Sequence, residues 1–149
     1  MKIRYARKSD FNFLIEGLEK NRVLEDRLKK DIKARKSDKN EFRYAIRKKS
    51  IRVIEYKEAP IAFLYFRTDF KVMYVYDRFF WVDLVYVREN CRRKGLGKLL
   101  YKDAMKIAKK KGFSEIVIDV FEANRNSIEF HKNLGFKPIY SIYKKNIYI

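Results

Sequence analysis

The sequence predicts an α/β (α+β) fold, a mixed β-sheet covered by helices, in a single domain spanning residues 1–149. Three observations support this prediction. Short runs of β-branched and aromatic residues have the length of strands. Helical stretches with one apolar face separate them, and strands alternate with helices in the second half. The chain is 47% hydrophobic and 16% aromatic, which suffices for one core without disulfides or metals.

The first half is expected to begin with a strand and two helices. Polar and apolar side chains alternate over residues 2–7, which predicts a strand. Apolar residues then recur at helical spacing over 11–18, after Ser9 or Asp10, either of which is suited to capping a helix. Residues 24–34 predict a second, strongly charged helix.

A segment rich in strands is expected next. β-branched and aromatic residues are frequent there, and a Lys-Glu-Ala-Pro turn indicates a hairpin. In order, the sequence predicts a polar break at 37–40, a strand at 42–56, a turn at 57–60, the returning strand at 61–66, and further strand at 72–76 and 79–87.

The clearest helix is expected at 95–111. Its apolar residues share one face, lysines spaced four apart form a basic stripe, and Gly112 ends it. Three more elements follow: a strand at 116–121, a short helix at 126–133 and a last strand or hairpin at 139–149.

Composition narrows the class of protein. A net charge of +18 favours polyanionic partners such as nucleic acid or phosphorylated ligands. The absence of glutamine and the 38% of charged residues are also typical of proteins from hot environments, so habitat is a second explanation of the charge. Cys91 and His131 are single, which excludes an intrachain disulfide and a Cys/His metal cluster. No apolar run reaches the ~20 residues of a membrane span, so we expect a cytoplasmic protein without a metal or a membrane partner.

The most informative segment joins a strand, a basic turn and a helix, and reads Arg92-Arg93-Lys94-Gly95-Leu96-Gly97-Lys98. A helix N-terminus favours a phosphate, because its first N–H groups are unpaired and carry partial positive charge. Gly95 and Gly97 let phosphate oxygens approach the backbone. The P-loop and dinucleotide-binding patterns are both absent. The alternative is a basic surface turn in front of an amphipathic helix.

Two segments together resemble the GNAT superfamily of acetyltransferases. Arg92 to Gly97 resembles its R/Q-x-x-G-x-G/A signature, and Asn124 to Phe136 is similar to its N-x-x-[A/S]-x-x-[F/L]-Y-x-x-x-G-F segment. The resemblance covers almost the whole chain. It implies the GNAT fold, a central sheet of about six or seven strands flanked by about four helices, with a splay between the fourth and fifth strands.

The same resemblance implies acetyl-CoA as co-substrate and assigns its contacts. The backbone of Leu84, Val85 and Val87 is expected to pair with the pantetheine arm, and Asn124 to contact the cofactor beyond the splay. The pyrophosphate is expected to contact Arg92, Arg93, Lys94, Gly95, Leu96, Gly97 and Lys98.

The chemistry requires a base that takes a proton from the acceptor amine. Asp119 and Asp83 stand where family members place that base, although either side chain is alternatively a solvent-facing residue of the sheet. The sequence departs from the family at the acid, because His131 occupies the usual tyrosine position. A packed histidine is the alternative, and some family members need no acid. The other candidates for the acid are Tyr86, Tyr101 and Tyr140.

The expected acceptor is a protein N-terminal or lysine amine. The alternatives are a small-molecule amine and a non-catalytic module that binds acetyl-CoA or RNA. The positive charge favours acidic acceptors or proteins bound to nucleic acid, as on the ribosome, and disfavours polyamines. Whether the protein is a monomer or a homodimer is left open.

Overall fold

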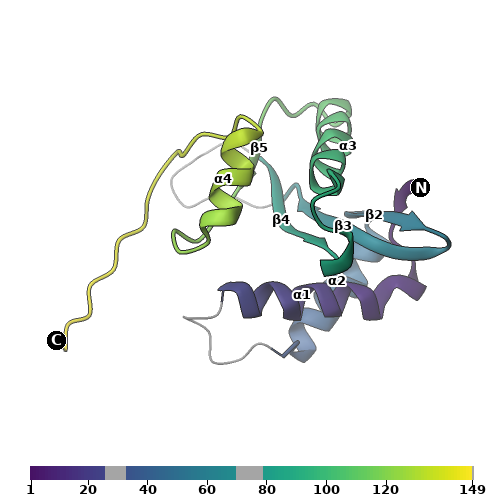
Figure 1. Ribbon diagram of the computed structural model, residues 1–149, viewed down its shortest axis with the longest axis horizontal. Coiled ribbons are helices and arrows are strands. Elements are labelled where there is room, and N and C mark those ends of the chain that lie inside the picture. Colours follow the sequence, from purple (N-terminus) through teal and green to yellow (C-terminus); the bar gives the residue numbers. More distant parts are fainter. Residues whose placement is uncertain (26–32, 70–78, 149) are drawn as a thin grey trace. The chain divides into compact units, whose positions relative to one another are not determined.

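The computed structural model describes residues 1–25, 33–69 and 79–148 (Figure 1). The chain divides after Asp119 into two compact units, which are described separately. Within the described ranges, the first unit contains the sheet, three helices and the basic turn. The second contains one helix and the C-terminal segment.

The first unit is built on a five-stranded sheet with the strands in chain order. These strands are β1 (Lys2–Tyr5), β2 (Ile51–Tyr56), β3 (Ala59–Arg67), β4 (Phe80–Val87) and β5 (Ile116–Ile118). Neighbouring strands are antiparallel except β4 and β5, which are parallel. The mixed sheet expected from the sequence is confirmed, although the described residues contain five strands and not six or seven.

Helices cover both faces of this sheet. They are α1 (Phe11–Glu25), α2 (Lys36–Arg47) and α3 (Leu96–Lys110), with short 3-10 turns η1 (Lys8–Asp10) and η2 (Glu89–Cys91). Helices α1 and α2 lie on one face and α3 on the other (Figure 1). The expected helix at 95–111 is confirmed, and its buried residues Leu96, Leu100, Tyr101, Ala104 and Ala108 recur at helical spacing.

An aromatic core holds α1 and α2 against β3 and β4. The Phe63 ring lies 5.7 Å from that of Phe13 and 5.9 Å from that of Tyr86, measured between centroids. Gly17 permits this packing, because a Cβ there would lie 2.8 Å from Tyr86 Cδ1 and nearer still to the Phe63 ring. The remaining buried residues of this cluster are Leu14, Phe42, Ala45, Ile51, Val53, Tyr65 and Leu84.

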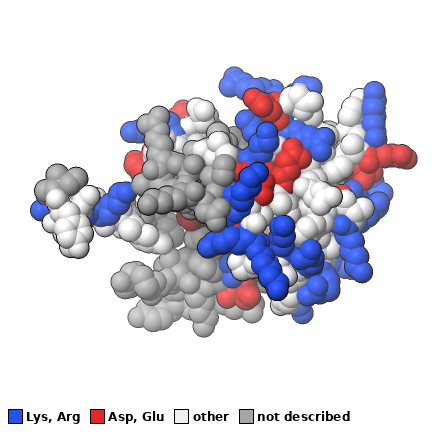
Figure 2. All heavy atoms as spheres, turned by 90° about the horizontal axis from the view of Figure 1, so that it is seen from below, with Lys and Arg blue, Asp and Glu red and all other residues white. Residues whose placement is uncertain are grey.

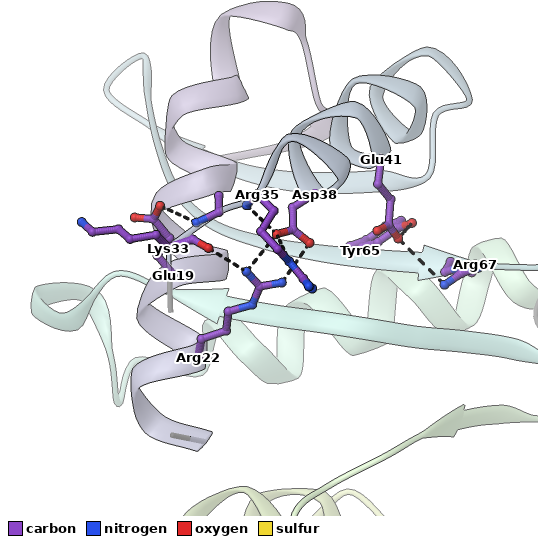
Figure 3. A network of polar contacts seen from close by, with 9 residues as sticks. Glu19, Arg22, Lys33, Arg35, Asp38, Glu41, Tyr65 and Arg67 are labelled. Carbon is purple, nitrogen blue, oxygen red and sulfur yellow. Dashed lines mark hydrogen bonds and ion pairs between the residues drawn. The ribbon is translucent and has the colours of Figure 1, made fainter. Parts of the chain in front are cut away.

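A buried ion pair joins α1 to α2 (Figure 3). Arg22 donates through Nη1 and Nη2 to the two carboxylate oxygens of Asp38, each at 2.9 Å. Asp38 also accepts the backbone N–H of Arg35 at 2.7 Å, which caps α2. These hydrogen bonds, that from Arg22 first, lower the pKa of Asp38 below its usual value.

Helix α2 corrects two expectations. The polar break at 37–40 and the first part of the strand at 42–56 are wrong, because Lys36–Arg47 is helical and strand β2 begins only at Ile51. Asp38 stabilises the helix start, and Phe42, Ala45 and Ile46 then lie on one helical face against the core. The run of β-branched and aromatic residues therefore reports a buried helix face followed by a strand.

Other expected elements have different limits. The hairpin of β2 and β3 and the strand β4 are confirmed, whereas β5 ends at Ile118, before the expected Phe121. The expected strand at 72–76 and most of the expected helix at 24–34 lie outside the described residues.

The second unit contains α4 (Arg125–Asn133), close to the short helix expected there. Asn124 caps it, because its side chain accepts the N–H of Ser127 at 3.2 Å. The last strand expected at 139–149 is absent from residues 139–148. Ile142 is 85% exposed and Tyr143 92% exposed, so these residues have strand propensity but no packed surface to satisfy it.

Candidate functional site

The second half of β4 has an open edge. Strand β5 pairs with β4 only at Phe80, Trp81 and Val82, and it ends at Ile118. On the other side β4 stays paired to β3 as far as Val87. Within the described part of the chain, residues 83–87 therefore have no strand partner on the β5 side. An extended ligand can add there as a further strand, and the residues expected to bind pantetheine, Leu84, Val85 and Val87, all lie on this stretch.

A β-bulge stands at the point where the two strands part. Tyr65 pairs with Leu84 and Phe66 with Val82, so Asp83 is an extra residue of β4. As a consequence, side chains before and after Asp83 pack on opposite faces of the sheet. Phe80 stacks on Phe66, whereas Leu84 packs with Tyr65 on the opposite face of β3. Two residues four apart in a regular strand would share a face, so the bulge at Asp83 reverses the pleat.

The basic turn is shaped to bind an anion. Arg93 and Gly95 both have left-handed backbone, with φ of 63° and 76°. The first helical bond of α3 runs from the Leu99 N–H to the Gly95 carbonyl at 3.0 Å. No N–H group from 93 to 98 donates to a backbone carbonyl of the described residues. Six consecutive N–H groups at a helix start, in a backbone of alternating hand, form an anion-binding nest.

The surroundings of the nest suit a pyrophosphate. The side chains of Arg92, Arg93, Lys94 and Lys98 are all exposed next to the unpaired N–H groups. Arg92 Nε donates to the Val87 carbonyl at 3.0 Å, which ties the turn to the end of the open edge of β4. The residues from Asp83 to Lys98 thus form one continuous path from a free strand edge to the nest.

Asp83 is a carboxylate with an unusual environment. It is exposed as a residue, but loss of water around the carboxylate raises its pKa, and the charges of Glu41 and Asp119 act in the same direction. Arg67 and a hydrogen bond from Trp81 oppose this rise. Asp119 is exposed and lies one residue beyond β5 instead of within it. The structure thus brings the two expected base candidates within electrostatic reach of each other.

An open hollow of about 500 Å³ lies beside the end of β4. Its lining consists of Glu16, Lys20, Tyr86, Arg88, Glu89 and Asn90. Glu16 carries two contacts, accepting from the Tyr86 hydroxyl at 3.5 Å and lying 3.8 Å from Arg88 Nη2. Apart from Tyr86, the sequence analysis missed these residues. No motif marks them, because α1 and β4 meet only in the folded chain.

The second unit contains Asn124 and His131. The Asn124 side-chain oxygen caps α4. His131 is half-buried, and its Nδ1 lies 2.7 Å from the Ser127 carbonyl oxygen. Burial lowers the pKa of His131, while the hydrogen bond to Ser127 partly opposes this. Its ring also packs edge-on against Phe130 and Phe136, at 5.1 and 5.4 Å.

The tyrosines considered as substitute acids differ in environment. Tyr86 is buried with its hydroxyl toward the hollow, and burial raises its pKa. Tyr101 is 2% exposed within α3, and burial raises its pKa further. Tyr140 is largely exposed in the second unit. Of the two acid candidates in the first unit, Tyr86 lines the hollow and Tyr101 does not.

In the ranges 1–25, 33–69 and 79–148, no group of three or more His, Cys, Asp or Glu side chains is arranged to hold a metal ion. None of the helices described has the length and apolar character that crossing a bilayer requires.

Solved structures with the same fold are known. An aminoglycoside 6'-N-acetyltransferase from Acinetobacter haemolyticus is 22% identical with a TM-score of 0.72, covering 99% of each chain. A "predicted acetyltransferase" from Clostridium acetobutylicum, solved with acetyl-CoA, is 18% identical with a TM-score of 0.71, covering 99% of this chain and 96% of that one. A ribosomal-protein-alanine N-acetyltransferase from Brucella melitensis is 18% identical with a TM-score of 0.69, covering 92% of this chain and 85% of that one.

The family comparison covers most of the chain. The model of the acetyltransferase (GNAT) family matches residues 18–136, which include the open edge of β4, the nest and α4. The match agrees with a strand edge that leads into an anion site at a helix start. The chain therefore belongs to the acetyltransferase (GNAT) family and is an N-acetyltransferase with acetyl-CoA as its co-substrate.

Proposed function

We propose that the enzyme acetylates a protein amine, either an N-terminal α-amine or a lysine side chain. Transfer from acetyl-CoA is supported by the open edge of β4, which leads without interruption into the nest at 93–98. That arrangement suits an extended pantetheine arm with a pyrophosphate at its end. Acetyl-CoA supplies the thioester carbonyl that the amine attacks. The choice of a protein amine is supported by the open hollow beside β4.

The chain's own groups would divide the work as follows. The N–H groups of 93–98 and the exposed cations of the turn hold the pyrophosphate. The backbone of Leu84, Val85 and Val87 orients the pantetheine arm along β4. Both contributions are positioning, which lowers the barrier by fixing the reacting atoms close together.

Asp83 is our candidate for the base. A carboxylate with a raised pKa is a stronger proton acceptor, and the bulge places it where β4 parts from β5. Asp119, one residue past β5, is the second candidate. The pH dependence of kcat/KM in Asp83→Asn and Asp119→Asn separates the two candidates. Only loss of the base removes the acidic limb of the profile, which is the fall of kcat/KM at low pH where the base is protonated. An unchanged limb in Asp83→Asn overturns this assignment.

Two features favour a protein acceptor. The hollow beside β4 is open, whereas sites for small molecules usually enclose about 70–90% of the ligand surface. The net charge of +18 favours acceptors in acidic proteins or in proteins that lie on nucleic acid. A small-molecule amine is the second candidate, because aminoglycoside acetyltransferases share this fold.

The test is release of free CoA thiol from acetyl-CoA in the presence of N-terminal peptides, lysine peptides, polyamines, aminoglycosides and free amino acids. We expect turnover with peptides. Turnover confined to small amines would overturn the acceptor assignment. Binding of acetyl-CoA in a calorimeter without turnover on any acceptor would instead indicate a non-catalytic binding module.

A matched pair of glycine variants tests the nest. Gly95→Ala and Gly112→Ala both place a side chain on left-handed backbone, with φ of 76° and 84°, and neither new Cβ meets another atom within 4 Å. Each is expected to cost about 1 kcal/mol of folding stability. Only Gly95→Ala should weaken acetyl-CoA binding, by about tenfold, because only Gly95 lies among the unpaired N–H groups. Equal affinities in the two variants would remove the nest from the cofactor site.

A further inference from the structure

Three side chains from α2 and β3, those of Glu41, Tyr65 and Arg67, form a network (Figure 3). Tyr65 donates its hydroxyl to Glu41 Oε1 at 2.9 Å, and Arg67 Nη1 lies 3.8 Å from the same oxygen. Tyr65 is 4% exposed, so its ring is fixed in the core, whereas Glu41 is more exposed. Glu41 is therefore a surface carboxylate held by a rigid donor and by a cation.

This network lies around Asp83. On β3, Tyr65 pairs with Leu84 and Arg67 with Trp81, and Asp83 is the extra residue between those two partners. Glu41 adds to the rise in the pKa of Asp83, and burial first, then Glu41 and Asp83, raise the pKa of Tyr65. Neither Glu41 nor Tyr65 belongs to a motif of the sequence.

We propose that Glu41, held by Tyr65 and Arg67, is a positioning residue that keeps the Asp83 carboxylate ready to accept the proton of the acceptor amine. The inference rests on the proposed role of Asp83 as the base. It extends that role to a residue of α2 that is distant in sequence from β4. Helix α2 thus contributes to the reaction through a charge as well as through packing.

Loss of water is the largest cause of the raised pKa of Asp83, and the charges around the carboxylate adjust that pKa in both directions. Glu41 from α2 and Asp119 after β5 disfavour a second negative charge, so they hold a proton on Asp83 more tightly. Arg67 from β3 and the Trp81 hydrogen bond from β4 act in the opposite sense. Removing Glu41 therefore lowers the basicity of Asp83, and removing Arg67 raises it.

The experiment is the pH dependence of kcat/KM for one peptide acceptor in Glu41→Gln and Arg67→Gln. We expect the acidic limb to move to lower pH in Glu41→Gln and to higher pH in Arg67→Gln, with KM for acetyl-CoA unchanged. In Glu41→Gln, kcat at the optimum should fall by about tenfold, because a weaker base accepts the proton less readily. Glu115→Gln, the same change at an exposed residue before β5, is the control and should leave the limb in place.

The outcomes separate this inference from the proposed function. A limb that stays in place in both variants overturns the role of Glu41, even if Asp83→Asn is inactive. A limb that moves in the same direction in both variants also overturns the role of Glu41. Opposite shifts are expected only if the charges of Glu41 and Arg67 act on Asp83, and a packing role does not predict them. An acidic limb that persists in Asp83→Asn overturns the proposed base itself. Should Glu41→Gln fail to fold, Glu41→Ala takes its place with the same expected shift to lower pH, and an unmoved limb in that variant overturns the role of Glu41.

Discussion

His131 donates a hydrogen bond from Nδ1–H to the Ser127 carbonyl oxygen, because a carbonyl oxygen can only accept. The neutral ring therefore presents Nε2 as an acceptor. An acid role at Nε2 requires the imidazolium form, which the lowered pKa of His131 makes scarce above about pH 6.5. A single backbone contact thus decides which proton the histidine has to offer.

We therefore expect an acid role of His131 to appear as a fall in kcat as pH rises through its lowered pKa. In His131→Phe this fall should vanish and kcat below that pKa should drop by about tenfold, with KM for acetyl-CoA unchanged. The measurement is a pH profile of kcat at saturating acceptor. Ser127→Ala is the control, because the backbone carbonyl that orients the ring remains. Identical profiles for His131→Phe and the wild type would show that the ring only packs.

Helices α1 and α2 are joined by the ion pair of Arg22 and Asp38, which also caps α2. Glu41 follows Asp38 by less than one turn. The helix that carries one partner of this ion pair, called the clamp below, therefore also carries the charge proposed to act on Asp83. Stability and chemistry therefore depend on one orientation of α2.

The clamp should make stability depend on pH. The folded pKa of Asp38 is lowered, so its contribution is complete above the unfolded value of about 4 and is lost as pH falls through the folded pKa. Asp38→Asn leaves Arg22 buried without a carboxylate and should lower the free energy of unfolding at pH 7 by about 2 kcal/mol.

Urea unfolding at several pH values measures this effect. The gap between Asp38→Asn and the wild type should narrow below about pH 4. Asp69→Asn is the matched control, since its side chain is 77% exposed and its contact with Arg67 is 3.8 Å long, so almost no change is expected. A gap that is independent of pH would contradict the electrostatic role of Asp38.

Element types were predictable where local pattern and tertiary packing agree. The lysine stripe and the apolar face predicted α3. The two motifs predicted the turn before α3 and the helix α4. The prediction for 36–47 was wrong because Phe42, Ala45 and Ile46 suit a strand as well as a helix. The helix is selected only by the Asp38 cap and by packing against the core. The bulge and Glu41 could not be predicted, since both depend on how β3, β4 and α2 meet.

Charge is distributed over the whole molecule. On the face in Figure 2, Lys and Arg side chains are scattered with Asp and Glu between them and do not form one block. The carboxylates around Asp83 lie in this positive field, which attracts a phosphorylated co-substrate from a distance.

KM for acetyl-CoA should therefore rise severalfold between about 0.05 and 0.5 M NaCl, since salt shortens the Debye length to a few ångström. A short acetyl thioester without phosphates is the control and should show little salt dependence. Steady-state kinetics at fixed pH measure both. Equal salt dependence for the two thioesters would show that the cations of the chain, including those at the nest, do not act on the phosphates.

The extra residue in β4 limits how this sheet can change. Substitution at Asp83 keeps the number of residues in β4, whereas its deletion would restore simple alternation and turn Leu84 and Tyr86 out of the aromatic core. Insertion of one residue between Phe80 and Leu84 would do the same. The packing of β4 therefore depends on the number of its residues as well as on their identity.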